Sequence, residues 1–453
     1  MMWAQDGRTG PERDVSDGVI DLGELPPRGQ RRLLPAGVRR PLPYRAILGA
    51  VAVLLLGLLG GAVYHPPPAG PKIIAAKLAD TTFVAGDRLF VVSAGEDLFG
   101  SVVHNKIVSE YALPAGSLLS QTTVAVTGAI FNVMAVGDTI LVSYQVDTVG
   151  AEATVALIAG TAKARWRHTA RLLTVSGEHG LVLLRENSPQ FGSLHWYGID
   201  LTTGATRWAL DQPVFGYTIE ALDRNDFPTL LVTAGVNGHV EVRDAVTGRL
   251  VAKADVQTPP DWRTTGISMW AADGLVLLGG RAGTTAYSLT DLAKVWDNTI
   301  DLAERYVLPH CADAICVVGT LTGVQVLDPA TGKARWASAT WSALEQAGAY
   351  LLADGPVGGP AAQPQAIVDP HTGRRLGDFG NWHSASGPRP DGTVIGLRQK
   401  SGDDVVWFAA LDPATRAVRV LGSADRVSGD CRTTAEVLVC RRLDASVGIW
   451  SLG

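Results

Sequence analysis

One phrase recurs along most of the chain and constrains its fold more than any single motif. It consists of an apolar strand, a polar turn and then a tryptophan or an aliphatic residue, as in VQVLDPATGKARW at 324–336. Successive copies end about forty to forty-five residues apart, a period typical of folds built from repeated supersecondary units. The other copies occupy 155–166, 197–208, 240–251, 286–296, 366–376 and 408–420.

The turn within the phrase has a clear physical basis. Asp328 can accept hydrogen bonds from nearby backbone N–H groups, Pro329 has a preset φ, and Gly332 is free to adopt positive φ. Each copy follows a second hairpin that contains a short run of strand-forming residues, so each period holds about four strands. These runs are 181–184, 230–233, 275–278, 315–318 and 393–396.

Four-stranded units at this period predict a β-propeller, in which each blade packs its faces against its neighbours. The composition agrees, because 51 glycines and 25 prolines with only 18% charged residues suit many short strands and tight turns. Residues 447–452 lack a following strand and 73–78 lack a preceding one, so the two ends would close the ring. We expect an all-β domain over 73–453 with about eight blades, although a tally that includes 83–113 reaches nine.

The segment LDPATGKARW at 327–336 resembles the tryptophan-containing repeat of the pyrroloquinoline-quinone-like (PQQ-like) propeller family. The resemblance covers roughly 73–453 and implies a propeller whose repeat tryptophans dock against the next blade. Large aromatic side chains chiefly contribute buried area. The four tryptophans are therefore expected to be packing residues: Trp166, Trp208, Trp296 and Trp336.

The same family contains quinoprotein dehydrogenases, which resemble one another in a vicinal Cys-Cys pair, a Glu and Asn that hold calcium, and an Asp base. This chain has no Cys-Cys dipeptide, and no such set can be transferred to it position by position. It also lacks HExxH, GxSxG, GxxxxGK[ST] and a GxGxxG after a strand. We therefore expect no catalytic residue, no metal site and no cofactor; PQQ with calcium belongs to the alternative of a PQQ-dependent dehydrogenase.

The four cysteines fall in two close pairs, which predict the disulfides Cys311–Cys316 and Cys431–Cys440. Neither pair has a spacing typical of a zinc site, and free buried thiols are the remaining alternative. Disulfides require an oxidising compartment, so this reading favours an extracytoplasmic domain.

A run without charged residues, AILGAVAVLLLGLLGGAVY at 46–64, is long enough to predict a transmembrane helix. A cleaved signal peptide is the alternative. Arginines crowd the N-terminal side of this run, while only Lys72 and Lys77 lie near on the other, so the N-terminus should be cytoplasmic. These arginines are Arg28, Arg31, Arg32, Arg39, Arg40 and Arg45.

The tail at 1–45 is rich in Gly, Pro, Arg and Asp, which predicts disorder, and 65–72 is a proline-rich linker. Within the tail, Ile20, Asp21 and Leu22 belong to a patch that alternates apolar and acidic residues. This patch is typical of a short motif for a cytoplasmic partner, and a solvated linker is the alternative.

These observations predict a single-pass membrane protein whose extracytoplasmic propeller is a non-enzymatic binding or scaffolding module for a protein or a cell-wall component. Nucleic acid is not an expected partner, because the net charge is −5 and no basic stripe is present. Two other functions stay open. One is the PQQ-dependent dehydrogenase, and the other is a sensor that relays occupancy through the tail.

Overall fold

The structure of the protein is a computed structural model. It describes residues 70–94, 103–146, 151–187, 194–213, 217–222, 227–257, 268–319, 322–355, 365–385, 389, 391–399 and 402–452. The predicted tail 1–45, the segment 46–64, and 65–69 of the linker lie outside these residues. The described residues belong to one compact unit, Pro66–Gly453.

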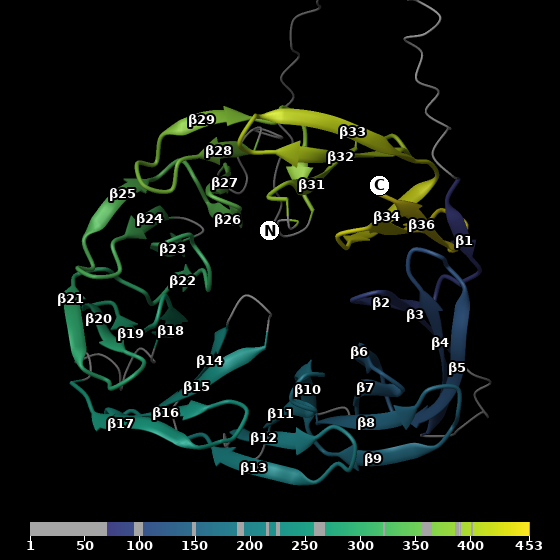
Figure 1. Cartoon of the computed structure of the whole chain (residues 1–453), viewed down its shortest axis with the longest axis horizontal. Coiled ribbons are helices and arrows are strands. Elements are labelled where there is room, and N and C mark those ends of the chain that lie inside the picture. The colour runs from purple at the N-terminus through teal and green to yellow at the C-terminus, as the bar shows by residue number, and fades with distance from the viewer. Residues whose placement is uncertain are drawn as a thin grey trace, which may run out of the picture. The chain divides into compact units, whose positions relative to one another are not determined.

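This unit is a β-propeller of nine four-stranded antiparallel sheets, numbered here as blades 1 to 9 in chain order (Figure 1). Within each blade, the first strand is the innermost and the fourth is the outermost. Blade 1 consists of β2 (Thr81–Ala85), β3 (Arg88–Ala94), β4 (His104–Ala112) and β5 (Leu118–Val126), and blade 2 consists of β6 (Ile130–Val136), β7 (Thr139–Gln145), β8 (Glu152–Ile158) and β9 (Ala164–His168). Blade 3 consists of β10 (Arg171–Ser176), β11 (Leu181–Asn187), β12 (Leu194–Asp200) and β13 (Thr206–Asp211), and blade 4 consists of β14 (Tyr217–Leu222), β15 (Pro228–Ala234), β16 (His239–Asp244) and β17 (Leu250–Asp255).

The remaining blades follow the same plan. Blade 5 consists of β18 (Ser268–Ala272), β19 (Leu275–Gly280), β20 (Gly283–Ser288) and β21 (Lys294–Asn298), and blade 6 consists of β22 (Tyr306–Val307), β23 (Ile315–Gly319), β24 (Gly323–Leu327) and β25 (Ala334–Ser338). Blade 7 consists of β26 (Ala343–Ala347), β27 (Tyr350–Asp354), β28 (Ala366–Val368) and β29 (Arg375–Asp378), and blade 8 consists of β30 (His383–Ser384), β31 (Val394–Gln399), β32 (Val406–Asp412) and β33 (Ala417–Ala424). Blade 9 consists of β34 (Val427–Thr433), β35 (Val437–Arg442), β36 (Val447–Ser451) and β1 (Lys72–Ile74).

Two parts of the predicted fold need correction. The propeller has nine blades and not eight, because blade 1 lacks the phrase of strand, polar turn and tryptophan or aliphatic residue on which the preferred count relied, and blade 9 is divided between the chain ends. The part of the chain that the structure describes consists of strands, with no helix long and apolar enough to cross a membrane. The structure therefore provides no transmembrane helix, and the segment 46–64 is outside the described residues.

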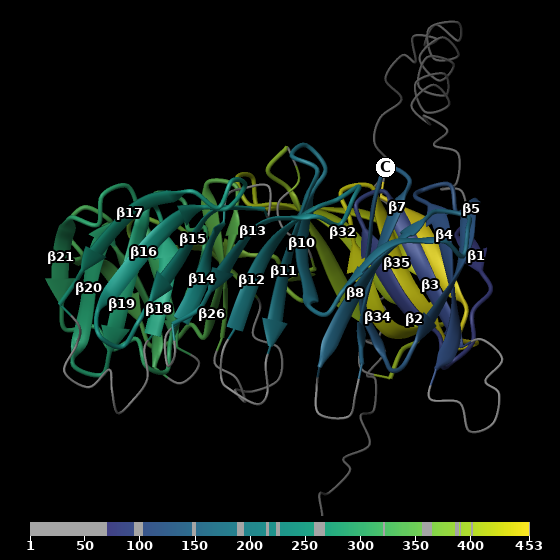
Figure 2. The same cartoon turned by 90° about the horizontal axis from the view of Figure 1, so that it is seen from below.

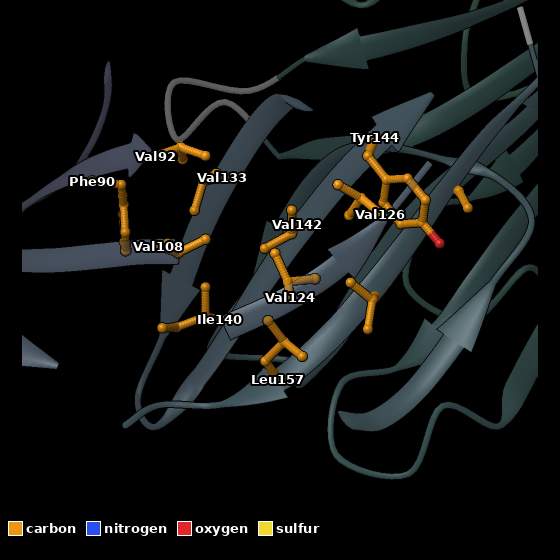
Figure 3. Packing of buried hydrophobic residues seen from close by; sticks show 12 residues of the cluster. Phe90, Val92, Val108, Val124, Val126, Val133, Ile140, Val142, Tyr144 and Leu157 are labelled. Atoms are coloured by element: carbon orange, nitrogen blue, oxygen red, sulfur yellow. The ribbon is translucent and has the colours of Figure 1, made fainter. Parts of the chain in front are cut away.

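The core is divided among the seams between blades. In β7, Ile140, Val142 and Tyr144 face blade 1, whereas Leu141 packs toward blade 3, because successive side chains of a strand point to opposite faces. Figure 3 shows the seam between blades 1 and 2, where Ile140, Val142 and Tyr144 share one apolar cluster with Phe90 and other side chains of blade 1. Every blade thus buries apolar side chains on both faces of its sheet, and each pair of neighbours shares a separate cluster.

Blade 9 closes the ring by joining the two ends of the described chain. Its outermost strand β1 pairs with β36 over only three residue pairs, Lys72↔Ile449 to Ile74↔Val447. Arg441 adds a second link, since its guanidinium donates to the backbone carbonyls of Lys77 at 3.1 Å and Asp80 at 2.5 Å. A short ladder and one arginine, together with the packing of Ile74 in the seam between blades 9 and 1, therefore hold the N-terminal strand in the closing blade.

The four repeat tryptophans lie on the outermost strands of blades 2, 3, 5 and 6. Each indole N–H donates to a backbone carbonyl in the turn between the third and fourth strands of the next blade. The bonds are Trp166 to Leu201 at 2.9 Å, Trp208 to Val246 at 3.2 Å, Trp296 to Pro329 at 2.7 Å and Trp336 to Pro370 at 2.8 Å. The indole thus satisfies its own donor while it covers the seam.

A glycine in the next blade's turn makes room for each indole. At Gly332, where φ is +67°, a Cβ atom would lie 2.4 Å from the Trp296 ring. Two other seams place a small residue in the tryptophan position and a large one in the turn: Ala252 faces the buried Leu292, and Gly377 faces Arg416. Leu292 and Arg416 still adopt positive φ, 57° and 61°. Each of these seams therefore pairs one large and one small residue.

We predict that Gly332→Ala destabilises the propeller far more than Gly86→Ala. Both glycines have positive φ, which costs an alanine about 1–2 kcal/mol, but only Gly332 has a neighbour that a Cβ would strike. Overpacking should add about 1–3 kcal/mol. Urea unfolding midpoints of the two variants measure the difference.

The cost of positive φ and the cost of the collision with the indole can be measured separately in a Trp296→Ala background. There the collision is absent, so Gly332→Ala should cost no more than Gly86→Ala, and the two seam substitutions should be non-additive. Equal costs of Gly332→Ala in both backgrounds would show that the indole does not require the glycine.

Candidate functional site

The structure pairs the four cysteines as the sequence predicted. Cys311, in the connection from β22, bonds to Cys316 on β23, and Cys431 on β34 bonds to Cys440 on β35. Each bridge therefore links the inner part of a blade to its second strand. The tail residues Ile20, Asp21 and Leu22 lie outside the described residues, so the predicted cytoplasmic motif stays a prediction.

The vicinal cysteine pair of the quinoprotein cofactor site has no counterpart in this chain. All four thiols are used in the two disulfides, so no vicinal cysteine pair is available beside a quinone. Within the described ranges, no group of three or more His, Cys, Asp or Glu side chains is placed to hold a metal ion.

A polar cluster that the sequence did not reveal combines residues of blade 3 with His168 on the outermost strand of blade 2. The Tyr197 hydroxyl donates to Glu186 at 2.7 Å, and its ring lies 4.7 Å from the His168 ring, while His195 contacts Asp211 at 2.7 Å. Burial raises the pKa of the Tyr197 phenol well above its usual range, and the Glu186 carboxylate adds to the rise. Burial lowers the pKa of the His168 imidazole. The cluster thus keeps a protonated phenol beside a carboxylate.

A second polar cluster joins blades 7 and 8. The Ser384 hydroxyl donates to the Glu345 carboxylate, and buried Gln365 both donates to the Ser384 Oγ at 2.9 Å and accepts from the Ser384 N–H at 3.0 Å. Burial raises the pKa of Glu345; the hydrogen bond from Ser384 opposes this effect, and Asp354 adds to it. The cluster is a clamp between β26 and β30 that includes a partly buried carboxyl group.

The two faces of the ring carry different connections. Because strands alternate in direction, the turn between the third and fourth strands lies on one face, here called the turn face. Links between blades and between second and third strands lie on the opposite face, here called the connection face. Figure 2 shows the strands running between the two faces.

A pocket of about 400 Å³ opens on the connection face at the seam of blades 1 and 2. Its walls come from the beginnings of β2, β4 and β6 and from the connections that precede β2 and β6. We call it the seam pocket, and its lining residues are Ala79, Thr81, Val92, His104, Lys106, Gly128, Ala129 and Ile130.

Three exposed apolar residues are adjacent in sequence to residues that line the seam pocket. Leu78 precedes Ala79 and is 84% exposed, Val103 precedes His104 and is 48% exposed, and Phe131 follows Ile130 and is 38% exposed. Lys106 provides an ammonium group in the lining, and no carboxylate among the described residues forms an ion pair with it. The seam pocket thus carries a positive charge, and exposed apolar residues are adjacent in sequence to its lining; the sequence alone did not indicate this site.

The comparisons with known proteins give structural neighbours only. No family model matches this sequence, and no curated protein matches it. Similar solved structures include BamB from Moraxella catarrhalis, which is 13% identical, with 71% of this chain and 96% of that chain covered and a TM-score of 0.39. Two others are the computationally designed Ika8 protein, at 12% identity with 72% and 96% covered and a TM-score of 0.42, and the C-terminal WD40 domain of Sif2, at 8% identity with 69% and 92% covered and a TM-score of 0.39. The propeller assignment rests on the strand topology, and these similarities carry no argument about function.

We predict that Glu345→Gln removes part of the pH dependence of folding. Because the folded state raises the pKa of Glu345 above its ordinary value of 4.5, the stability linked to this group is complete below pH 4.5 and is lost as the pH rises through the raised pKa. The free energy of unfolding of the wild type should therefore fall relative to the variant as the pH rises above 4.5. Urea titrations across that range measure it.

The exposed Glu436→Gln substitution is the matched control, since Glu436 lies outside the clamp. Its unfolding free energy over the same range provides the reference against which the effect of Glu345→Gln is measured. A curve for Glu345→Gln that differs from the wild type no more than this reference does would show that burial of Glu345 has no effect on its titration.

Proposed function

We propose that this protein is a non-enzymatic docking module that binds another protein at the seam pocket. The supporting observation is that the exposed residues Leu78, Val103 and Phe131 are each adjacent in sequence to a residue lining a pocket that contains Lys106. Single exposed apolar residues are common on protein surfaces. Three of them, each adjacent in sequence to a residue that lines one pocket, support the proposal of a binding surface that includes the pocket and its surroundings.

The chemistry of the site defines the partner. Removing an exposed aliphatic side chain from water stabilises a complex by about 1.5–3 kcal/mol, so Leu78 and Val103 favour an apolar anchor on the partner. The Lys106 ammonium favours a carboxylate within reach of that anchor. We therefore propose a protein segment that presents an apolar side chain next to an acidic group.

The two disulfides support an extracytoplasmic location, because such bonds persist in oxidising compartments. The docked tryptophans support a relationship to the PQQ-like propellers, in the non-catalytic part of that family. A propeller suits this role, since its seams hold the framework rigid while its connections present a surface.

We predict that a photo-cross-linking amino acid at position 103 gives a discrete protein adduct in cells. Leu78→Asp or Lys106→Glu in the same chain should reduce that adduct by roughly tenfold, which corresponds to about 1.4 kcal/mol of binding. Gel mobility and mass spectrometry of the adduct measure the effect.

Position 420 provides the matched control, because Val420 is similarly exposed but lies on the outer strand β33 of blade 8. The same cross-linker there should give no adduct of that mass. Equal adducts from both positions, or an adduct at 103 that neither substitution weakens, would argue against docking at the seam pocket. Unchanged unfolding midpoints of the variants exclude misfolding as the cause of a loss.

A further inference from the structure

The two disulfides differ in their access to solvent. Cys311 and Cys316 are 3% and 0% exposed, so their bond is enclosed in the seam between blades 6 and 7. Cys440 is also fully buried, but its partner Cys431 is only partly buried. Thiol–disulfide exchange requires a thiolate to reach a sulfur atom. Cys431 is the one cysteine of the four that is not buried, which makes its sulfur the candidate for attack.

Cys431 lines a pocket of about 510 Å³ on the turn face, where blades 8, 9 and 1 meet. Val84 and Gly86 contribute the blade 1 side, and Ala385 contributes the blade 8 side. The Thr433 hydroxyl donates to the Ala385 carbonyl at 3.1 Å and so links the pocket walls. A pocket of this volume accommodates a small molecule the size of a peptide of a few residues.

The positive charge in the pocket favours an anionic ligand. Arg432 follows Cys431, is exposed and lines the same pocket. A guanidinium attracts thiolates and carboxylates, so it raises the local concentration of an acidic thiol and stabilises its reactive form.

The backbone around the Cys431–Cys440 disulfide makes the redox state of this bond important for the pairing of the strands that it links. The ladder between β34 and β35 is irregular from Val427 to Arg432, with φ of +133° at Gly429, so the disulfide links the strands where regular pairing is interrupted. Cys440 packs in the cluster between blades 8 and 9. The bond therefore holds the innermost strand of the blade that closes the ring.

We infer that Cys431–Cys440 is a thiol-exchange site for an acidic low-molecular-weight thiol. The thiolate attacks the Cys431 sulfur, a mixed disulfide forms there, and the bond to Cys440 breaks so that Cys440 leaves as a thiolate and takes up a proton. A second thiolate then attacks the sulfur of the bound small molecule, which releases the oxidised small-molecule disulfide and the Cys431 thiolate. The protein bond gains two electrons, and the two small thiols lose them.

Glutathione is the probe for this inference, used on the folded full chain and followed by rapid alkylation and peptide mass mapping. We expect glutathione on Cys431 and the alkyl group on Cys440, at a rate roughly tenfold or more above any reaction of Cys311–Cys316. Equal rates for the two bridges, glutathione on Cys440, or no reaction of the folded chain would overturn the inference.

Arg432→Gln tests the role of charge while it leaves both disulfides in place. The variant should react several-fold more slowly with glutathione, whereas its reaction with cationic cysteamine should change little or accelerate. Arg432→Lys should restore most of the glutathione rate. Equal slowing with both thiols would show that Arg432 does not act through its charge and would remove that part of the inference.

Discussion

Packing across the seams between blades is the interaction on which the whole structure depends. Leu141 and Ile140 are neighbours in β7, yet they belong to the cores of two different seams. A blade with two apolar faces cannot shield itself from water, so it needs a neighbour on each side. This requirement continues round the ring until blade 9 meets blade 1, which explains why the two ends of the described chain combine in one sheet.

The residues at the tryptophan and turn-glycine positions differ from seam to seam, while the packing of one blade on the next is kept. Where Trp296 extends from one blade, Gly332 stands in the next; where Gly377 takes the tryptophan position, Arg416 takes the glycine position and donates to the Leu376 carbonyl. Each of these seams thus pairs one large residue with one small one, and the large side chain can come from either blade, which keeps the interface filled as close packing requires.

Both proposed sites lie where the repeat is least regular. Blade 1 lacks the repeat phrase and contains two nine-residue strands, β4 and β5, and blade 9 is assembled from both ends of the described chain. The seam pocket opens beside the first of these blades, and Cys431 lies at the interrupted ladder of the second. Positions released from the repeat pattern are available for binding and chemistry, while the regular blades maintain the framework.

The sequence by itself determined the propeller class, the turn chemistry and the disulfide pairs, because each depends on residues close together in the chain, such as Asp328 with Gly332 or Cys311 with Cys316. Only the tertiary structure decided the blade count and the sites. Blade 9 needs a pairing between Lys72 and Ile449, and the seam pocket brings Ala79 together with His104 and Ile130. Such contacts depend on how many blades close the ring and which side chains meet across a seam, and no local pattern encodes them.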